Sequence, residues 1–422
     1  MRKRFLPLLG AVLCGISLLA GCGAKEDGVL FPEPNAIRFG GGQPGLPFEQ
    51  GVLFEKNGEM GIRYLDFQSG SVDYFCALPN CTHKDSSCPA MDSMGLRGKF
   101  VAGGKFYNLS ADLRTQLNEK ENLLSYTSTM SVSGMDRQNA KEIGTYRGEN
   151  TSVVLYRGRA VLFNLDIPAS LRGGGFSSGS NDKAELYLQT LDLNTQALSE
   201  EVPIAEGYNL SLQKFLGAVG DTLYFRFLYA PQPVDYSVFE ELSPEESIAR
   251  FHDIYTTQYC AYDIAENQIR FLETGFPEQF SGDSDDTEPV YIYQGVIFYT
   301  KDKKLMAYDI SKQKESLVYD GELAEAAQGT FAYDGAMYFT KSYTDFIKAE
   351  RFRYDLKTGE VLELSSSSQG AAFLQLYGEG GGWLYGLTSS GMFIGEDSGE
   401  IIYGRAKTED FLHGEWRMEI CD

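Results

Sequence analysis

Positive charge is scarce in this chain of 422 residues, which carries 37 Lys and Arg against 59 Asp and Glu and has a formal net charge of −22. A surface of this sign repels phosphate backbones and anionic lipid, so nucleic acid is not expected as a partner. Long apolar runs are also missing after the N-terminus. Since a transmembrane helix needs ~20 apolar residues, no later stretch is expected to span a membrane.

Familiar catalytic motifs are missing as well. The sequence contains neither a nucleophile elbow nor a pattern that would pair a thiol with an orienting base. Its acidic run "DSDDTE" at 283–288 lacks the spaced ligands and the turn glycine of an EF-hand loop. A calcium site at Asp283, Asp285 and Asp286 is therefore a weak candidate, with a solvated acidic loop as the alternative.

The N-terminus has the pattern of an export signal. Arg2, Lys3 and Arg4 precede an apolar run that ends in Leu-Ala-Gly-Cys at Cys22. These features predict a signal peptide over 1–21, and the ending resembles the bacterial lipobox, in which the cysteine is lipid-modified. The alternative is an ordinary signal peptide that happens to contain Cys22. We expect an exported protein anchored by lipid to the outer face of the cell membrane, with 22–44 as a flexible tether.

Two short patterns recur along the rest of the chain. One is a turn followed by an apolar and aromatic strand, as in "GVLF" at 51, "GKFY" at 104, "GRAVLF" at 158, "DTLYF" at 221, "GVIFY" at 295, "GAMYF" at 335 and "GWLYG" at 382. The other is a strand that ends in an aspartate-led turn, with Asp66, Asp192, Asp263, Asp309 and Asp355. An aspartate at the start of a turn can accept hydrogen bonds from its own backbone, so these residues are predicted to be structural.

This repetition predicts an all-β chain built from four-stranded units. A lone four-stranded sheet cannot bury both faces, so repeats of this length stack radially. We predict one seven-bladed β-propeller over 45–422, with six or eight blades as alternatives. The repeats lack the Trp-Asp ending of WD40 blades. The 53 Tyr and Phe residues are expected mainly in the core, because aromatic side chains fit pleated, half-buried surfaces.

Three insertions, about 109–121, 166–183 and 229–254, fall between second and third strands, on one common face. They are predicted to build an asymmetric binding surface, since loops carry function more often than strands; chance drift in length is the alternative. Ser243, Pro244 and Glu246 predict a capped helix in the third insertion. Its apolar stripe is expected to pack on the propeller, through Leu242, Ile248, Phe251 and Ile254. The candidate ligand-binding residues of the insertions are Arg172, Phe176, Tyr236, His252 and Asp253, with a solvated surface histidine as the alternative for His252.

The stretch "CALPNCTHKDSSC" at 76–88 connects the first predicted blade to the second. Its three cysteines and one histidine, Cys76, Cys81, His83 and Cys88, match a closed tetrahedral shell for a structural zinc ion. A disulfide is the main alternative, because exported proteins meet oxidising surroundings. It would leave an odd thiol unless a bridge reached Cys260 or Cys421. A reactive thiol is the third and weakest alternative.

Three features carry a resemblance: the lipobox, the "YLDFQSG" strand running into C-x4-C-x-H-x4-C, and the later "YD" blades. In these features the chain resembles a broad group of β-propeller lipoproteins on Gram-positive, anaerobic gut bacteria. The resemblance covers most of the chain. It implies the propeller fold and surface anchoring, and it implies no particular activity. On such an anaerobe a persistent disulfide would be less expected, which favours the metal.

We therefore predict a cell-surface lipoprotein that acts as a non-catalytic module for ligand binding or protein scaffolding, with a glycan, peptide or protein as its ligand. The alternative is an extracellular, glycan-active hydrolase or lyase that uses the propeller mouth. Such an enzyme needs two carboxyl groups ~5–9 Å apart, or a His or Tyr with a carboxylate. Its candidate residues are Asp166, Asp235, Tyr236, His252 and Asp253.

Overall fold

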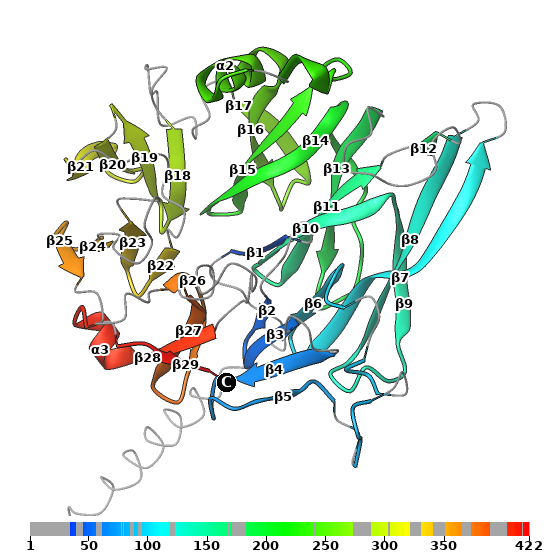
Figure 1. Ribbon diagram of the computed structural model, residues 1–422, viewed down its shortest axis with the longest axis horizontal. Coiled ribbons are helices and arrows are strands. Elements are labelled where there is room, and N and C mark those ends of the chain that lie inside the picture. Colours follow the sequence, from blue (N-terminus) through cyan, green and yellow to red (C-terminus); the bar gives the residue numbers. More distant parts are fainter. Residues whose placement is uncertain are drawn as a thin grey trace, which may run out of the picture.

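The regular structure of the computed structural model in Figure 1 consists mainly of β-strands, which confirms the prediction of an all-β chain. The structure describes the following residues: 34–38, 45–55, 61–76, 78, 80–84, 88–91, 95–118, 123–166, 169–170, 183–239, 242–272, 288–302, 304–320, 331–340, 351–364, 373–388, 403–415 and 417–421.

The strands pair as antiparallel groups of four, here called units 1 to 7 in chain order. Unit 1 contains β2 (Leu46–Phe48), β3 (Gly51–Glu55), β4 (Ile62–Asp66) and β5 (Val72–Tyr74). Unit 2 contains β6 (Lys99–Ala102), β7 (Lys105–Asn118), β8 (Leu123–Gly134) and β9 (Lys141–Arg147). Unit 3 contains β10 (Glu149–Tyr156), β11 (Arg159–Asp166), β13 (Lys183–Asp192) and the first part of β14 (Val202–Val219). Unit 4 contains the second part of β14, with β15 (Thr222–Ala230), β16 (Thr256–Asp263) and β17 (Gln268–Leu272).

The last three units have the same order of pairing. Unit 5 contains β18 (Glu288–Tyr293), β19 (Val296–Lys301), β20 (Lys304–Asp309) and β21 (Lys314–Tyr319). Unit 6 contains β22 (Phe331–Tyr333), β23 (Ala336–Thr340), β24 (Arg351–Asp355) and β25 (Val361–Leu364). Unit 7 contains β26 (Phe373–Gly380), β27 (Trp383–Thr388), β28 (Tyr403–Lys407) and β29 (Glu419–Ile420). The remaining elements are β1 (Asn35–Arg38), β12 (Ala169–Ser170), the 3-10 helix η1 (Tyr236–Phe239), α2 (Pro244–Ile254) and α3 (Thr408–Leu412).

Asp-led turns join the third and fourth strands in most units, as the sequence predicts. Asp192 Oδ1 accepts the backbone N–H groups of Asn194 (3.0 Å) and Thr195 (2.8 Å), and Asp355 does the same three units later. The Thr195 N–H holds the pKa of Asp192 below its usual value. The fourth residue after each aspartate has a positive φ: Gly70, Gln196, Asn267, Gln313 and Gly359. Turn chemistry therefore accounts for the recurrence of these aspartates.

The short turns of neighbouring units contact one another, which shows that these turns lie at the same end of each unit. The backbone N–H of Gly103 in unit 2 donates to Glu49 of unit 1 (2.9 Å), and Arg157 of unit 3 pairs with Asp221 of unit 4 (2.6 Å). These turns join first to second strands. We call the face that carries them, together with the Asp-led turns, the turn face. The opposite face, the insertion face, carries the connections between second and third strands and those between units.

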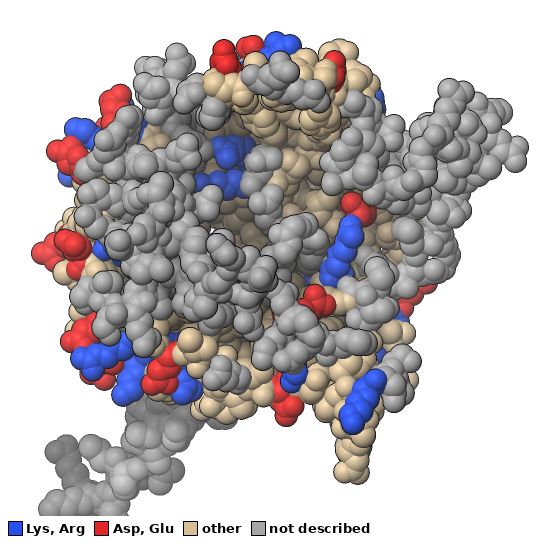
Figure 2. Space-filling model, in the orientation of Figure 1, with Lys and Arg blue, Asp and Glu red and all other residues tan. Residues whose placement is uncertain are grey.

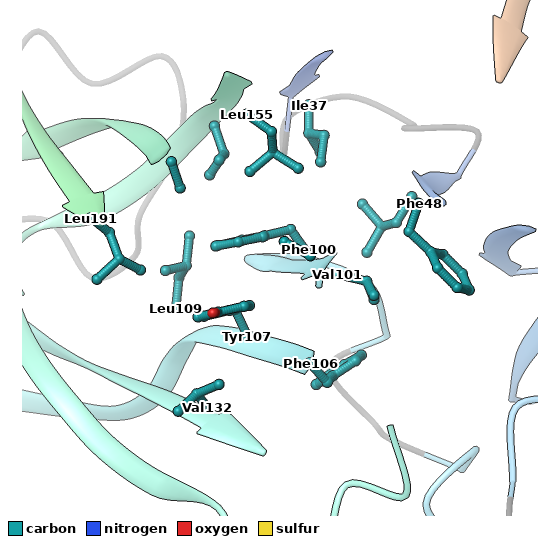
Figure 3. Packing of buried hydrophobic residues seen from close by; sticks show 14 of the residues in the cluster. Ile37, Phe48, Phe100, Val101, Phe106, Tyr107, Leu109, Val132, Leu155 and Leu191 are labelled. Atoms are coloured by element: carbon teal, nitrogen blue, oxygen red, sulfur yellow. The ribbon is translucent and has the colours of Figure 1, made fainter. Parts of the chain in front are cut away.

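The units are arranged around a common centre in Figure 1 and pack face to face. One apolar cluster joins units 1 to 3, and further clusters join each later unit to the next. Figure 3 shows part of the first cluster, in which Phe100 stacks on Tyr107 with ring centroids 4.6 Å apart. Both faces of each sheet are thereby buried, as the predicted radial stacking requires.

Side chains also join the last unit to the first. No strand pairing among the described residues links unit 7 to unit 1, but Val52, Phe54, Leu65 and Phe67 of unit 1 form one cluster with Tyr385 and Tyr403 of unit 7. Phe67 stacks on Tyr385 at 5.0 Å between ring centroids. Gly378 makes room for Phe67, since a Cβ at Gly378 would lie 2.2 Å from its ring. The circle of units is thus completed by apolar packing.

The strand β1 lies within the segment that was expected to be a tether. It pairs antiparallel with β10, with Asn35 opposite Leu155 and Arg38 opposite Ser152. Because the other edge of β10 pairs with β11, β1 occupies the inner edge of unit 3. Ile37 is buried in the first apolar cluster (Figure 3). Residues 35–38 are therefore part of the sheet, upstream of the predicted start at residue 45.

The structure revises one of the expected insertions and confirms the helix predicted in another. Residues 109–118 continue β7 and pair with β8, so the first insertion begins as a long hairpin that projects outward in Figure 1. The third insertion contains the predicted helix, α2, with Ser243 and Glu246 in a reciprocal capping box. In unit 5 the same connection is short, between Lys301 and Lys304. No helix in the described part of the chain is long and apolar enough to cross a membrane.

We expect the Phe67→Ala variant to be destabilised by about 3–5 kcal/mol, because it leaves a cavity in the packing between units 7 and 1. Urea denaturation followed by tyrosine fluorescence measures this loss. Phe271→Ala is the matched control: Phe271 lies on the outer strand β17, and 54% of its surface is exposed. A loss of similar size in both variants would contradict a special role for the contact between the first and last units.

Candidate metal centre and ligand-binding face

The residues Cys76, Cys81, His83 and Cys88 come together in one cluster on the insertion face. Their ligand atoms all lie within 4.8 Å of one another, and His83 Nδ1 is 3.3 Å from Cys88 Sγ. The ligand atoms of a tetrahedral zinc ion lie about 3.5–3.8 Å apart, given Zn–S bonds of ~2.3 Å and Zn–N bonds of ~2.0 Å. The four residues can therefore hold one metal ion with no open coordination position.

Local backbone conformation brings these side chains together. Asn80 and His83 both have positive φ, 58° and 52°, which reverses the chain between Cys76 and Cys88. Such angles are uncommon for residues other than glycine, although Asn and His adopt them more readily than most. The reversal places three ligands from eight consecutive positions, Cys76 to His83, beside the buried thiol of Cys88.

Stacking on Tyr74 holds the histidine ring, and Arg63 in turn holds Tyr74. The ring of Tyr74 stacks on His83 with centroids 4.5 Å apart, and the guanidinium of Arg63 lies 3.6 Å from the centroid of Tyr74. Both residues belong to unit 1, on β5 and β4. A ring fixed in this way presents its Nδ1 to the thiols without further loss of side-chain freedom.

Hydrogen bonds tie the same connection to units 1 and 2. The backbone N–H of Ile62 donates to Ala90 O (2.8 Å), and that of Leu96 donates to Glu55 Oε1 (3.2 Å). Arg137 of unit 2 donates to Pro89 O. A metal ion in this cluster would therefore fix the connection to both of the units that it joins.

The thiol of Cys88 resists ionisation in the absence of a cation. Burial raises the pKa of Cys88 to about 11, and the neighbouring thiols of Cys81 and Cys76 add to this effect. A metal cation offsets the cost, since it binds the thiolates directly.

The other cysteines lie elsewhere. No disulfide joins the five cysteines of the described residues. Cys260 is buried in the core that units 3 and 4 share, and Cys421 packs against the cluster between units 7 and 1. Neither of them belongs to the group of four.

The predicted ligand-binding residues of the third insertion are exposed but separate. Tyr236 shares a hydrogen bond with Tyr255, His252 lies edge-on to Phe251, and Asp253 pairs weakly with Arg250 (3.8 Å). No described hydrogen bond or ion pair joins Tyr236, His252 and Asp253 to one another. The structure does not bring these three residues into one site.

The expected packing of the α2 stripe is wrong in part. Leu242 and Phe251 are exposed, and Phe251 stacks on Tyr255, which follows the helix, at 4.4 Å. Ile254 is half-buried. The helix folds back on its own flanking residue, which leaves part of its apolar side uncovered.

Several predicted residues lie outside the described residues: the signal peptide 1–21, Cys22, Arg172, Phe176, Asp283, Asp285 and Asp286.

Sequence analysis did not predict a charged cluster that lies between units 2 and 3. Of its residues, only Asp166 was among the candidates. Arg147 of β9 donates to Asp166 (2.9 Å) and Glu185 (3.1 Å) through Nη1, and to Glu201 (2.8 Å) through Nη2. Asp166 and Glu185 are directly opposite each other on β11 and β13. Like charges in that position repel, so Arg147 stabilises the pair. Four separate elements contribute these residues, and no spacing in the sequence relates them.

The geometry of this cluster favours a structural role. Asp166 and Glu185 share one guanidinium nitrogen, so their carboxylate oxygens are close enough for glycosidic chemistry. Burial raises the pKa of Asp166, but Arg147 opposes that shift and occupies the space between the two carboxylates. Tyr187 stands beneath the guanidinium and donates to Arg147 O (2.5 Å). The arginine leaves no room there for a substrate between the two acids.

Charge is distributed unevenly over the surface. Figure 2 shows one face of the molecule with a hollow near its centre that is bordered by Lys or Arg atoms, while both acidic and basic side chains lie along the outline. The few basic residues of this acidic protein therefore include a group at a concave position.

No protein-family model and no curated protein matches the sequence. Among solved structures, Porphyromonas gingivalis dipeptidyl peptidase 4 is similar over 91% of this chain and 53% of its own, at 12% identity and a TM-score of 0.40. An oligogalacturonate lyase from Vibrio parahaemolyticus is similar over 75% and 81%, at 12% identity and a TM-score of 0.36. Pyrococcus horikoshii acylaminoacyl peptidase covers 82% and 48%, at 11% identity and a TM-score of 0.41. The chain thus spans about half the length of the two peptidases, and these likenesses assign it no activity.

We expect Arg147→Gln to destabilise the protein by about 1–2 kcal/mol at pH 7, because it leaves the buried Asp166 beside a second carboxylate. This is less than the 3–5 kcal/mol typical of a broken buried pair, since 41% of the Arg147 side chain is exposed. The pKa of Asp166 is already raised, so its proton binds more tightly in the folded state than in the unfolded state. The loss should therefore shrink as the pH falls through that pKa.

Urea denaturation at pH 7 and pH 4.5 measures both effects. Arg97→Gln is the control, since its pair with Glu149 also bridges units 2 and 3 but is more exposed. A loss in Arg147→Gln that is independent of pH would contradict the assignment to uncompensated carboxylates.

Proposed function

We propose that this chain is a seven-bladed β-propeller of an exported lipoprotein, attached through Cys22, which binds an extracellular ligand on its insertion face. Seven consecutive four-stranded units, packed face to face around one centre, support the number of blades. The resemblance of the lipobox and of the cysteine–histidine stretch to β-propeller lipoproteins supports the anchoring.

The observation that carries the binding function is the pairing between two insertions. Ala169 and Ser170 of unit 3 form β12, which pairs with Leu124 and Leu123 of β8 in unit 2. Insertions that merely drifted in length would not be expected to join by strand pairing. The two insertions therefore support one built surface, and the α2 insertion belongs to the next unit around the centre in Figure 1.

A non-catalytic role fits this arrangement better than a hydrolase or lyase. A hydrolase or lyase needs an acid and a base that are free to act on a substrate. Among the described candidates, Asp166 is held by Arg147, and Asp235 accepts hydrogen bonds from its own turn at Ser237. Lys and Arg at the central hollow favour a ligand with anionic groups (Figure 2).

We further propose that Cys76, Cys81, His83 and Cys88 bind one structural zinc ion. Soft thiolates with one imidazole in a tetrahedral set select zinc, whereas calcium takes oxygen ligands. A disulfide would use two of the three thiols and would not explain why His83 Nδ1 points at Cys88.

The exported chain should therefore carry one zinc ion that is released on denaturation with the three thiols intact, and Cys88→Ser should lose the metal. Native and denatured mass spectrometry give the stoichiometry, and calorimetry gives the stability. The Tm should fall by a few degrees, since the ion stabilises one connection and not the entire core.

Cys421→Ser is the matched control, as this half-buried thiol lies outside the group and should leave zinc binding unchanged. A metal-free chain whose mass is lower by two hydrogens would show a disulfide in the cluster and would contradict the zinc site.

Replacing 231–255 with an Asn-Gly turn should weaken ligand binding about tenfold or more, a loss of about 1.4 kcal/mol, while the propeller stays folded. Fluorescent acidic oligosaccharides and acidic peptides serve as probes, with neutral oligosaccharides of equal length for comparison. Circular dichroism and the Tm confirm folding.

Glu266→Ala changes the turn face of the same unit and should leave binding intact. Equal binding by the deletion variant would contradict the insertion face as the binding site. Shortening of an oligosaccharide probe, or formation of unsaturated products, would favour the enzyme reading instead.

A further inference from the structure

The direction in which β1 runs shows from which face the N-terminus enters the ring. Leu155, the partner of Asn35, lies two residues before the turn at Arg157, and this turn belongs to the turn face. Arg38 lies opposite Ser152, closer to the insertion face. The chain therefore enters at the turn face, close to the centre, and runs toward the insertion face.

We infer that the ring is held with its turn face toward the membrane and its insertion face outward. This inference rests on the proposed lipid attachment at Cys22. The lipid surface is then the neighbour of the short turns, whereas the cluster at 76–88 and the three insertions face the surroundings of the cell.

The length of chain between Cys22 and Asn35 supports this orientation. Thirteen residues reach at most about 47 Å when fully extended, and a flexible coil of that length spans roughly 20 Å. A tether that runs outside the ring would have to pass around unit 3 to turn the insertion face to the membrane.

That path is almost as long as the fully extended tether. It crosses four strand spacings of about 4.8 Å from β1 to the outer strand, which is ~19 Å. It then follows a strand of eight residues, such as β11, for ~26 Å. The sum of about 45 Å leaves no slack, even before side chains are included. The turn face can meet the membrane with a relaxed tether.

Energy transfer to the bilayer tests the orientation. A donor-labelled amino acid replaces either Glu266, exposed in the Asp-led turn of unit 4, or Asp253, exposed on α2 of the same unit. The labels are separated by the length of β16, so no other unit enters the comparison. The full exported chain is placed in vesicles that carry acceptor-labelled headgroups.

The Glu266 position should transfer energy more efficiently than the Asp253 position. Equal or reversed efficiencies would overturn the orientation. A second form, residues 23–422 with an N-terminal hexahistidine tag on nickel-chelating lipid, fixes the same end of the chain without native lipidation. Exported chain that lacks lipid by mass would refute attachment at Cys22, while the tagged form would still decide the orientation.

Discussion

The fold depends on the burial of both faces of every four-stranded sheet. Each unit has apolar side chains on both faces, and only a neighbour on each side removes them from water. Units 1 and 7 obey the same constraint, although no described strand pairing joins them, through the stack of Phe67 on Tyr385. Because the cores between units provide the stability, the connections at the strand ends are free to differ in length. The long insertions of units 2, 3 and 4 and the short connection of unit 5 are both compatible with one ring.

The features that could be predicted are those that depend on residues close to one another in the sequence. Asp192 and Asp355 bond to backbone groups two and three residues away, and Ser243 with Glu246 caps α2. The four residues of the candidate metal centre also lie within one stretch of 13 residues, so their proximity was predictable. Contacts between distant elements were not predictable: Phe67 and Tyr385 are 318 positions apart, and the carboxylates around Arg147 come from three other elements. The helix α2 shows the limit of such predictions. Its spacing of apolar residues predicts an apolar side that includes Phe251, but the spacing does not predict which surface covers that side.

The metal cluster and the arginine cluster address the same physical problem at two neighbouring junctions. Between units 1 and 2, a long connection must be fixed without a strand, and four converging ligands can do this through one cation. Between units 2 and 3, the strands β11 and β13 place Asp166 directly opposite Glu185. There the cation is a side chain, Arg147, whose planar group can meet both carboxylates and Glu201 at once. A cation bound at the first junction would do what the guanidinium does at the second, which is to join groups that would otherwise repel each other.

The placement of these features relative to β1 connects structure with function. A chain that enters through the turn face leaves the opposite face free of its own N-terminal segment, so the proposed anchor would not hinder the surface built by β12 and β8. The turn face, by contrast, consists of tight turns whose polar groups are satisfied within each turn, as at Asp192 and Asp355. Such a surface has few polar groups left to bind lipid headgroups. It also has no long connections that could form a binding site for a ligand. The length differences among the connections therefore gather on the face opposite the entry of the chain, which is the arrangement that the proposed binding module requires.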